Sequence, residues 1–168
     1  MGKKGDRIEI RSATSKDYSD IIKVKKDGDN FRASSDNPET YDRTRERDPD
    51  SMLVAIGHGI VRRGRFLGVV FTKYDPEDHY QIANIYDGAI IPGYKRRLSV
   101  KRALENEASG RLLDKLVQRA EQLIDEQVEH EKETLEKQGV NPEERKQELK
   151  GEIDIEALKN KIIIRPFS

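Results

Sequence analysis

Cationic side chains gather at one point in the middle of the chain, where five of them fall within eight residues: Lys95, Arg96, Arg97, Lys101 and Arg102. They follow an apolar stretch, Ile85 to Ile91, which breaks at Pro92-Gly93. Lysine and arginine placed where a buried strand ends are able to hold the phosphates of a cofactor. The spacing therefore predicts a phosphate site, with Tyr94 inside it.

Two other interpretations of this basic cluster stay open. One is a solvated turn whose cations pair with Glu105, Glu107 and other acids. The other is a nucleic-acid surface, which is disfavoured because only Tyr94 is available to stack on bases. Nucleic acid is therefore not an expected partner.

Few other side chains could do chemistry. Asp87 lies near the end of the same apolar stretch and is a candidate general base, although an aspartate bound by turn amides is the common alternative. His58 and His79 flank expected strands and are expected at the surface. The chain has no cysteine and its three histidines lack metal-ligand spacing, so no metal site is expected.

The composition predicts one domain with a modest core. The 168 residues carry 32 Lys+Arg and 32 Asp+Glu, and charged residues reach 38% against 34% hydrophobic ones. A net charge of zero does not demand an acidic partner. The N-terminus has no apolar leader, and no apolar run approaches the roughly 18 residues of a membrane span. We therefore expect a cytoplasmic protein with no membrane partner.

The first 50 residues predict a strand, a helix and a loop. "RIEIRSA" alternates isoleucine with charged residues, which is typical of a half-buried strand. A helix follows, capped by Thr14 or Ser15. Residues 27–50 offer only Phe31 and Tyr41 as large apolar side chains, so they predict a mobile polar loop with one turn of helix.

The apolar residues of the core are concentrated next. "SMLVAIGHGIV" and "FLGVVFTKY" predict two strands joined by a hairpin, with Gly64 free to adopt positive φ and Arg65 in its solvated tip. "YQIANIYDGAII" predicts a third long strand, in which Tyr86 and Asp87 should point to opposite faces.

The C-terminal part predicts helices. Apolar residues at three- and four-residue spacings indicate a long amphipathic helix from about Ser109. Gly139 can end it, and Asn141-Pro142 can cap a second helix. The two should form an antiparallel hairpin whose distal part, residues 125–152, projects as a charged insertion. Ile162 to Ile164 predict a final buried strand. The fold class is α+β, with a mostly antiparallel mixed sheet flanked by helices.

This order of elements resembles the GNAT superfamily of acyl-CoA N-acyltransferases over residues 7–124. "RIEIRSATSKDYSDIIKV" is similar to that family's opening strand and helix, and "AIGHGIVRRGRFLGVVF" to its second and third strands. "IYDGAIIPGYKRR" looks like its fourth strand and basic turn, and "SGRLLDKLVQRAEQL" like the helix that follows. The family's fifth strand would be "KNKIIIRPF", after the hairpin.

The resemblance implies a GNAT-like single domain that binds acetyl-CoA or another acyl-CoA and transfers the acyl group to an amine. Backbone at Ile90 and Ile91 would hold the thioester carbonyl, and Asp87 would be the base. The cofactor phosphates would then be held by the remaining candidates: Tyr94, Lys95, Arg96, Arg97, Gly110 and Arg111.

The family's glycine-rich phosphate loop has two candidate registers here. One is Glu105-x-x-Ala108-x-Gly110, about a dozen residues after the basic turn. The other begins at Arg96 or Arg97 and puts Ser99 and Arg102 where glycine is expected. Because the glycines are displaced or lost, the alternative function is a catalytically inactive binding or assembly protein. Its hairpin, residues 111–150, would then hold a second copy or a protein partner.

Overall fold

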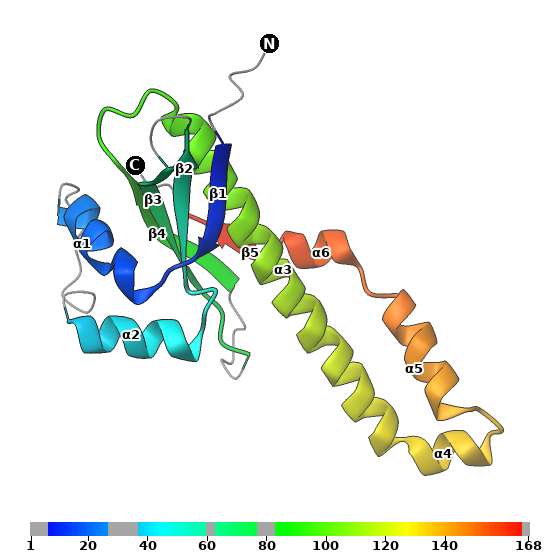
Figure 1. The fold of residues 1–168 in the computed structure, drawn as a ribbon. Coiled ribbons are helices and arrows are strands. Elements are labelled where there is room, and N and C mark those ends of the chain that lie inside the picture. Colours follow the sequence, from blue (N-terminus) through cyan, green and yellow to red (C-terminus); the bar gives the residue numbers. More distant parts are fainter. Residues whose placement is uncertain (1–6, 27–36, 60–62, 77–82, 166–168) are drawn as a thin grey trace.

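A five-stranded sheet forms the centre of the computed structural model, which describes residues 7–26, 37–59, 63–76 and 83–165. Its strands lie in chain order: β1 (Arg7–Ser12), β2 (Met52–His58), β3 (Arg63–Lys73), β4 (Ala83–Ile90) and β5 (Ile162–Ile164). The first four are antiparallel, while β5 runs parallel to β4 (Figure 1). The expected α+β class, with a mostly antiparallel mixed sheet and flanking helices, is confirmed.

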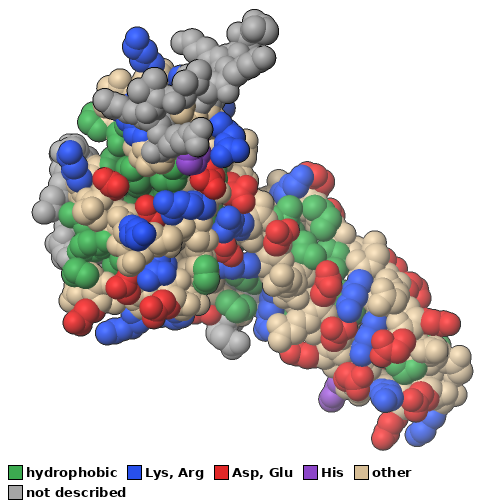
Figure 2. Space-filling view, viewed as in Figure 1, with side chains coloured by type: hydrophobic (Ala, Val, Ile, Leu, Met, Phe, Trp, Pro, Cys, Tyr) green, Lys and Arg blue, Asp and Glu red, His purple; other side chains and the backbone are tan. Residues whose placement is uncertain are grey.

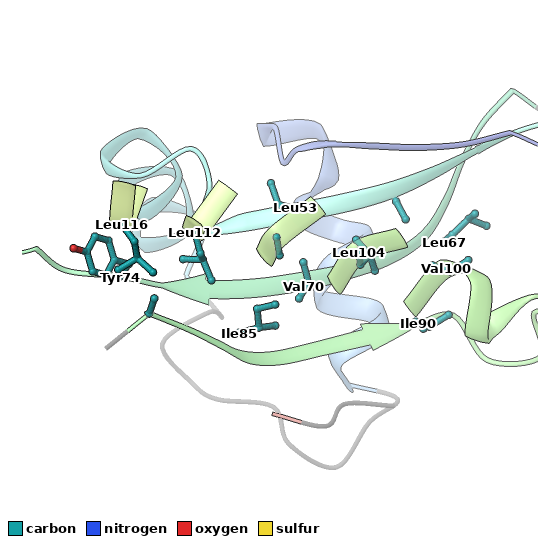
Figure 3. Packing of buried hydrophobic residues seen from close by; sticks show 13 residues of the cluster. Leu53, Leu67, Val70, Tyr74, Ile85, Ile90, Val100, Leu104, Leu112 and Leu116 are labelled. Atoms are coloured by element: carbon teal, nitrogen blue, oxygen red, sulfur yellow. The ribbon is translucent and has the colours of Figure 1, made fainter. Parts of the chain in front are cut away.

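Helices cover both faces of this sheet. The short η1 turn (Ser15–Asp17), α1 (Tyr18–Lys26) and α2 (Pro38–Arg47) lie on one face, and α3 (Arg97–His130) crosses the other (Figure 1). Buried residues on the α3 face include Leu53, Val70 and Ile85, which pack with Leu104 and Leu112 (Figure 3). Burying each such aliphatic side chain contributes about 1.5–3 kcal/mol, so the strand pattern and the helix stripe stabilise each other.

Helix α3 begins about a dozen residues earlier than the sequence predicts. It runs unbroken over 34 residues from Arg97, about 50 Å of helix. The reason is a buried row at four-residue spacing: Val100, Leu104, Ala108, Leu112 and Leu116. This row starts before Ser109, and the many charges between its members point to solvent and do not interrupt the helix.

The expected polar loop of residues 27–50 contains a helix. Residues 27–36 lie outside the described residues, but Pro38–Arg47 form α2. Asn37 caps it by accepting a hydrogen bond from the Glu39 N–H, and Pro38 occupies the first turn. Tyr41 is buried, and its hydroxyl donates to the Thr14 carbonyl at 2.6 Å. One anchored aromatic residue and a good cap were enough to order this segment.

The C-terminal part forms the predicted antiparallel arm. The distal half of α3 is followed by α4 (Lys132–Lys137), α5 (Pro142–Gly151) and α6 (Ile155–Lys159) (Figure 1). The Asn141 side chain caps α5 as predicted. Gly139 has φ +74°, but it follows α4, and the long helix α3 already ends at His130. Basic and acidic side chains are interspersed along the arm in Figure 2.

Strand β5 follows the arm and supplies the predicted fifth strand. It pairs with the first residues of β4. The expectation that its three isoleucines are buried is wrong for two of them, because Ile163 and Ile164 are about half exposed at the edge of the sheet. No helix in the described part of the chain is both long and apolar enough to cross a lipid bilayer.

Candidate functional site

A β-bulge interrupts β4 next to the candidate base. Phe71 of β3 pairs with Asp87, but the next residue, Thr72, pairs with Ile85, so Tyr86 is the extra residue. Tyr86 packs into the apolar cluster on the α1 face, with its ring 6.2 Å from that of Phe71. Asp87 also contacts α1. The prediction that these two side chains point to opposite faces is therefore wrong, because the bulge turns both toward α1.

Asp87 is tied to a lysine that sequence reasoning missed. Its Oδ2 accepts a hydrogen bond from Lys25 Nζ of α1, and its Oδ1 accepts one from the Gly88 N–H at 2.8 Å. Only 6% of the Lys25 side chain is exposed, against 21% for Asp87. Lys25 follows the buried Ile21 by four residues, so a cation on the apolar face of α1 was the available signal.

The C-terminal half of β4 has an open edge. Within the described residues, β5 pairs only with Ala83, Asn84 and Ile85. The Ile91 N–H donates to the Leu67 carbonyl of β3 at 2.9 Å. Because hydrogen-bonding directions alternate along a strand, the Ile90 N–H points the other way, toward the open edge. Ile90 can therefore donate to a ligand lying there, whereas the Ile91 N–H is already used.

The start of α3 lies just beyond this open edge. Six residues separate Ile90 from Arg97, the first helical residue. In the described structure no side chain caps this end, and the first turn has no acidic residue. The first helical hydrogen bond of the turn runs from the Val100 N–H to the Arg96 carbonyl. The N–H groups of Arg97, Leu98 and Ser99 have no partner inside the helix, and such a helix end attracts phosphate.

The basic cluster surrounds this helix start, but its members are not equivalent. Lys95 and Arg96 are exposed. Arg97 is held by the backbone, because its guanidinium donates to the carbonyl oxygens of Ile91 at 3.1 Å and Ile90 at 3.4 Å. Arg65 of β3 is exposed, as expected for a solvated residue, and also lies over the Tyr94 ring, 5.6 Å from its centroid. The fold thus adds a cation that the linear sequence does not reveal.

Gly110 and Arg111 do not join this group. Both lie in the middle of α3, where backbone N–H groups bond within the helix. Arg111 binds elsewhere: it donates to Asp50 at 2.8 Å, to Ser12 Oγ at 3.0 Å and to Glu107 at 3.1 Å. The register that begins at Glu105 cannot supply open amides, so the register at Arg96 or Arg97 is the one that the backbone allows.

The histidines lie apart from the open edge. His58 contacts Glu9 at 2.8 Å on the outer strands, and His79 lies outside the described residues. The described residues contain no group of three or more His, Cys, Asp or Glu side chains that could hold a metal. What the site offers is an open strand edge, a helix start and cations in one line. This arrangement suits an extended ligand with amides along its length and phosphate at one end.

The sequence matches no family model and no curated protein. Solved structures do show similarity. Ard1 from Thermoplasma volcanium matches with a TM-score of 0.47 and 16% identity, over 62% of this chain and 63% of that one. The chain thus spans less than two thirds of that Ard1.

Two further solved structures are similar at the same level. A Trypanosoma brucei acetyltransferase matches with a TM-score of 0.39 and 17% identity, over 61% of this chain and 72% of its own. The aminoglycoside N-acetyltransferase AAC(6')-Iy, solved in complex with CoA, matches with a TM-score of 0.39 and 13% identity, over 64% and 72%. Similarity at this level does not establish an activity, which has to rest on the residues of this chain.

Proposed function

We propose that the chain is a divergent member of the GNAT superfamily and transfers an acyl group from acyl-CoA to an amine. One observation carries the proposal: the open edge of β4 leads directly into the uncapped start of α3. An acyl-CoA has a thioester at one end, amides along its pantetheine arm and phosphates at the other end. The thioester and the phosphates lie at opposite ends of this ligand, just as the open edge at Ile90 and the helix start at Arg97 follow one another along the chain.

The residues of the site have distinct roles in this proposal. The Ile90 N–H donates to the thioester carbonyl, whose oxygen gains negative charge as the amine attacks. The amine nitrogen forms the new bond to the carbonyl carbon, the carbon–sulfur bond breaks, and CoA leaves as a thiolate that takes a proton. Asp87 accepts the proton that the amine loses, while Lys25 fixes the orientation of its carboxylate.

Phosphate binding in this proposal depends on charge more than on close backbone approach. Glycine at a helix start lets phosphate touch the amides, and here Leu98 and Ser99 occupy the first turn instead. Lys95 and Arg96 are exposed beside that turn, so their long side chains can reach phosphate oxygens at a greater distance. We therefore expect weak, salt-sensitive cofactor binding.

Thermal unfolding with acetyl-CoA or CoA tests the proposal, because a ligand that binds the folded state must raise its stability. At millimolar ligand we expect a higher Tm for the wild type and a smaller rise for Arg96→Gln. The matched control is Lys159→Gln, which removes an exposed cation of α6 and should respond as the wild type does. No rise in Tm for the wild type with either compound would contradict the proposal.

The arm favours a second candidate function, a catalytically inactive protein that binds a partner. Lys146 binds Glu129 at 3.2 Å, and Lys150 binds Asp125 at 2.9 Å, so α5 is tied along α3. Leu123 and Val140 remain exposed on the arm. Either side chain could contact a second copy or another protein.

Light scattering at two protein concentrations tests this second candidate for self-association. A dimer should form in the wild type and be lost in the double variant Leu123→Gln, Val140→Gln. A wild type that is monomeric at both concentrations would contradict self-association through the arm.

A further inference from the structure

A concave site lies at the opposite end of the sheet from the start of α3. It is a groove of about 830 Å³ between the end of α2, the end of β3 and the middle of α3. The groove lies near the first residues of β4, whereas the proposed phosphate site follows its last residue. Tyr86 is the β4 residue that lines the groove, and it lies four residues before Ile90, so roughly 13 Å of strand separates the two.

The charges that line the groove are mostly positive. Four cations reach it: Arg47 from α2, Lys73 from β3, and Lys115 and Arg119 from α3. Two carboxylates, Asp48 and Asp75, accompany them. Lys115 is already bound to Asp48 at 2.7 Å and lies 3.6 Å from Asp50, which leaves the other three cations and Asp75 to set the charge of the groove. The balance favours an anionic ligand.

Among the described residues, two buried donors in the groove lack an acceptor. Tyr74 is 8% exposed, and its hydroxyl has no hydrogen-bond partner among the residues described. In Figure 3 the ring lies beside Leu116 at the end of the apolar cluster, with the oxygen directed away from the other labelled residues. Arg119 Nε is also buried without a partner in the described structure. Buried donors are rarely left unmatched in folded proteins, so each calls for an acceptor.

Both unmatched groups stay protonated at neutral pH. Burial raises the pKa of the Tyr74 hydroxyl above its usual value, and an arginine does not lose its proton. A ligand therefore has to bring acceptor oxygens to them. The Arg119 Nη1 already donates to Gln122 Oε1 at 3.2 Å, which shows that an oxygen acceptor fits beside this guanidinium.

We propose that this groove binds a small organic anion through a carboxylate or phosphate group. The anion oxygens accept from the Tyr74 hydroxyl and the Arg119 guanidinium, where they replace the Gln122 amide oxygen. Arg47 and Lys73 supply further positive charge at the rim. None of these residues is assigned to acyl-CoA, so anion binding in the groove can be tested independently of acyl transfer.

NMR titration of the labelled full chain tests the proposal, with inorganic phosphate and citrate as separate probes. Each is compared with sodium chloride at equal ionic strength, so that nonspecific screening is subtracted. Amide signals of residues 72–75 and 115–122 should shift saturably with at least one probe. The better probe identifies the ligand group as phosphate or carboxylate.

Three variants locate the binding. Tyr74→Phe should weaken it about fivefold and Arg119→Gln at least tenfold, the range of one neutral and one charged hydrogen bond. Tyr74→Phe removes only an unmatched hydroxyl, so its Tm should not fall. The control Lys159→Gln, at an exposed cation of α6 outside both basic sites, should bind as the wild type does.

Two results would overturn the proposal. The first is that the amide signals of residues 72–75 and 115–122 shift no more with either probe than with chloride. That result would mean that water alone accepts from the buried donors of the groove. The second is that the Arg119→Gln and Tyr74→Phe variants bind both probes as tightly as the wild type does. Shifts confined to residues 95–102 and lost in Arg102→Gln would place anion binding at the start of α3 and would equally refute the groove.

Discussion

The ammonium of Lys25 on α1 binds the carboxylate of Asp87 at the bulge of β4, and the cation is the more deeply buried partner, 6% exposed against 21%. Removing one member of a buried ion pair leaves the charge of the other member buried without its opposite charge. We predict that Asp87→Asn, which strands the buried ammonium, lowers the free energy of unfolding by about 3 kcal/mol. Lys25→Met should lower the free energy of unfolding by about 1 kcal/mol, because the Asp87 carboxylate remains partly exposed to solvent and still accepts the hydrogen bond from the Gly88 N–H.

Urea unfolding of the two single variants and of the double variant measures this asymmetry. The double variant should be more stable than Asp87→Asn, since an apolar side chain then fills the site of the cation. Asp42→Asn, which removes the partner of Arg45 from a more exposed pair, is the control and should change stability by less than about 0.5 kcal/mol. Equal losses in both single variants would show that burial of Lys25 does not govern the pair.

A carboxylate introduced at the start of α3 should have opposite effects on the stability of the helix and on the binding of CoA. Ser99 is exposed in the first turn, where no acid is present. We predict that Ser99→Glu raises the free energy of unfolding by about 0.5 kcal/mol, because an anion interacts favourably with the helix start. The same charge should repel phosphate and reduce the Tm rise caused by CoA.

The control for this variant lies at the far end of the same helix. Gln127→Glu adds an identical charge near the last turn, where the helix dipole disfavours it. It should lower stability slightly and leave the CoA response unchanged. If Ser99→Glu binds CoA as well as the wild type, the phosphates do not lie at the start of α3.

Much of the core architecture could be predicted from the sequence, because β2, β3 and β4 have long apolar runs that only a buried sheet can accommodate. The start of α3 could not, because Leu98, Lys101 and Arg102 obscure the buried row that begins at Val100. Helix α2 was missed for another reason. Its local signal, the Asn37-Pro38 cap, is present in the sequence, but its anchor is Tyr41, whose contacts with Thr14 and Tyr18 are made far along the chain.

The candidate site was predictable only where its residues are neighbours in sequence. The line from Ile90 through Lys95 to Arg96 could be predicted because it follows one strand into one turn. Lys25 and Arg65 come from other elements and reach the site only through the fold. A bulge moves side chains by one position, which is why the expected orientation of Tyr86 was wrong.

Acid should weaken the N-terminal region through Asp17. This carboxylate is buried, and burial alone would raise its pKa. Hydrogen bonds from Arg11 at 2.7 and 3.0 Å and from the Thr14 N–H at 2.7 Å outweigh burial and hold the pKa below its usual value near 3.8. A lowered folded-state pKa gives stability that is fully present above the usual value and is lost as pH falls through the folded-state value.

We therefore predict that Asp17→Asn costs about 2 kcal/mol at neutral pH, and that its deficit relative to wild type shrinks as pH falls below about 4. Denaturant unfolding at several pH values measures this. Glu133→Gln, at an exposed position of α4, should show no such pH-dependent deficit. A deficit for Asp17→Asn that stays constant down to pH 2 would mean that its proton equilibrium does not contribute.

Two glycine-to-alanine variants should change stability in opposite directions. A Cβ at Gly68 of β3 would lie 2.8 Å from the Ala89 carbonyl oxygen, so Gly68→Ala must displace backbone and should cost at least about 2 kcal/mol. A Cβ at Gly110 of α3 meets nothing within 4 Å, so Gly110→Ala should stabilise the helix by about 0.5–1 kcal/mol. Urea unfolding gives both values. Gly110→Ala should also show the wild-type rise in Tm with CoA. Loss of that rise would show that Gly110 contributes to the phosphate site.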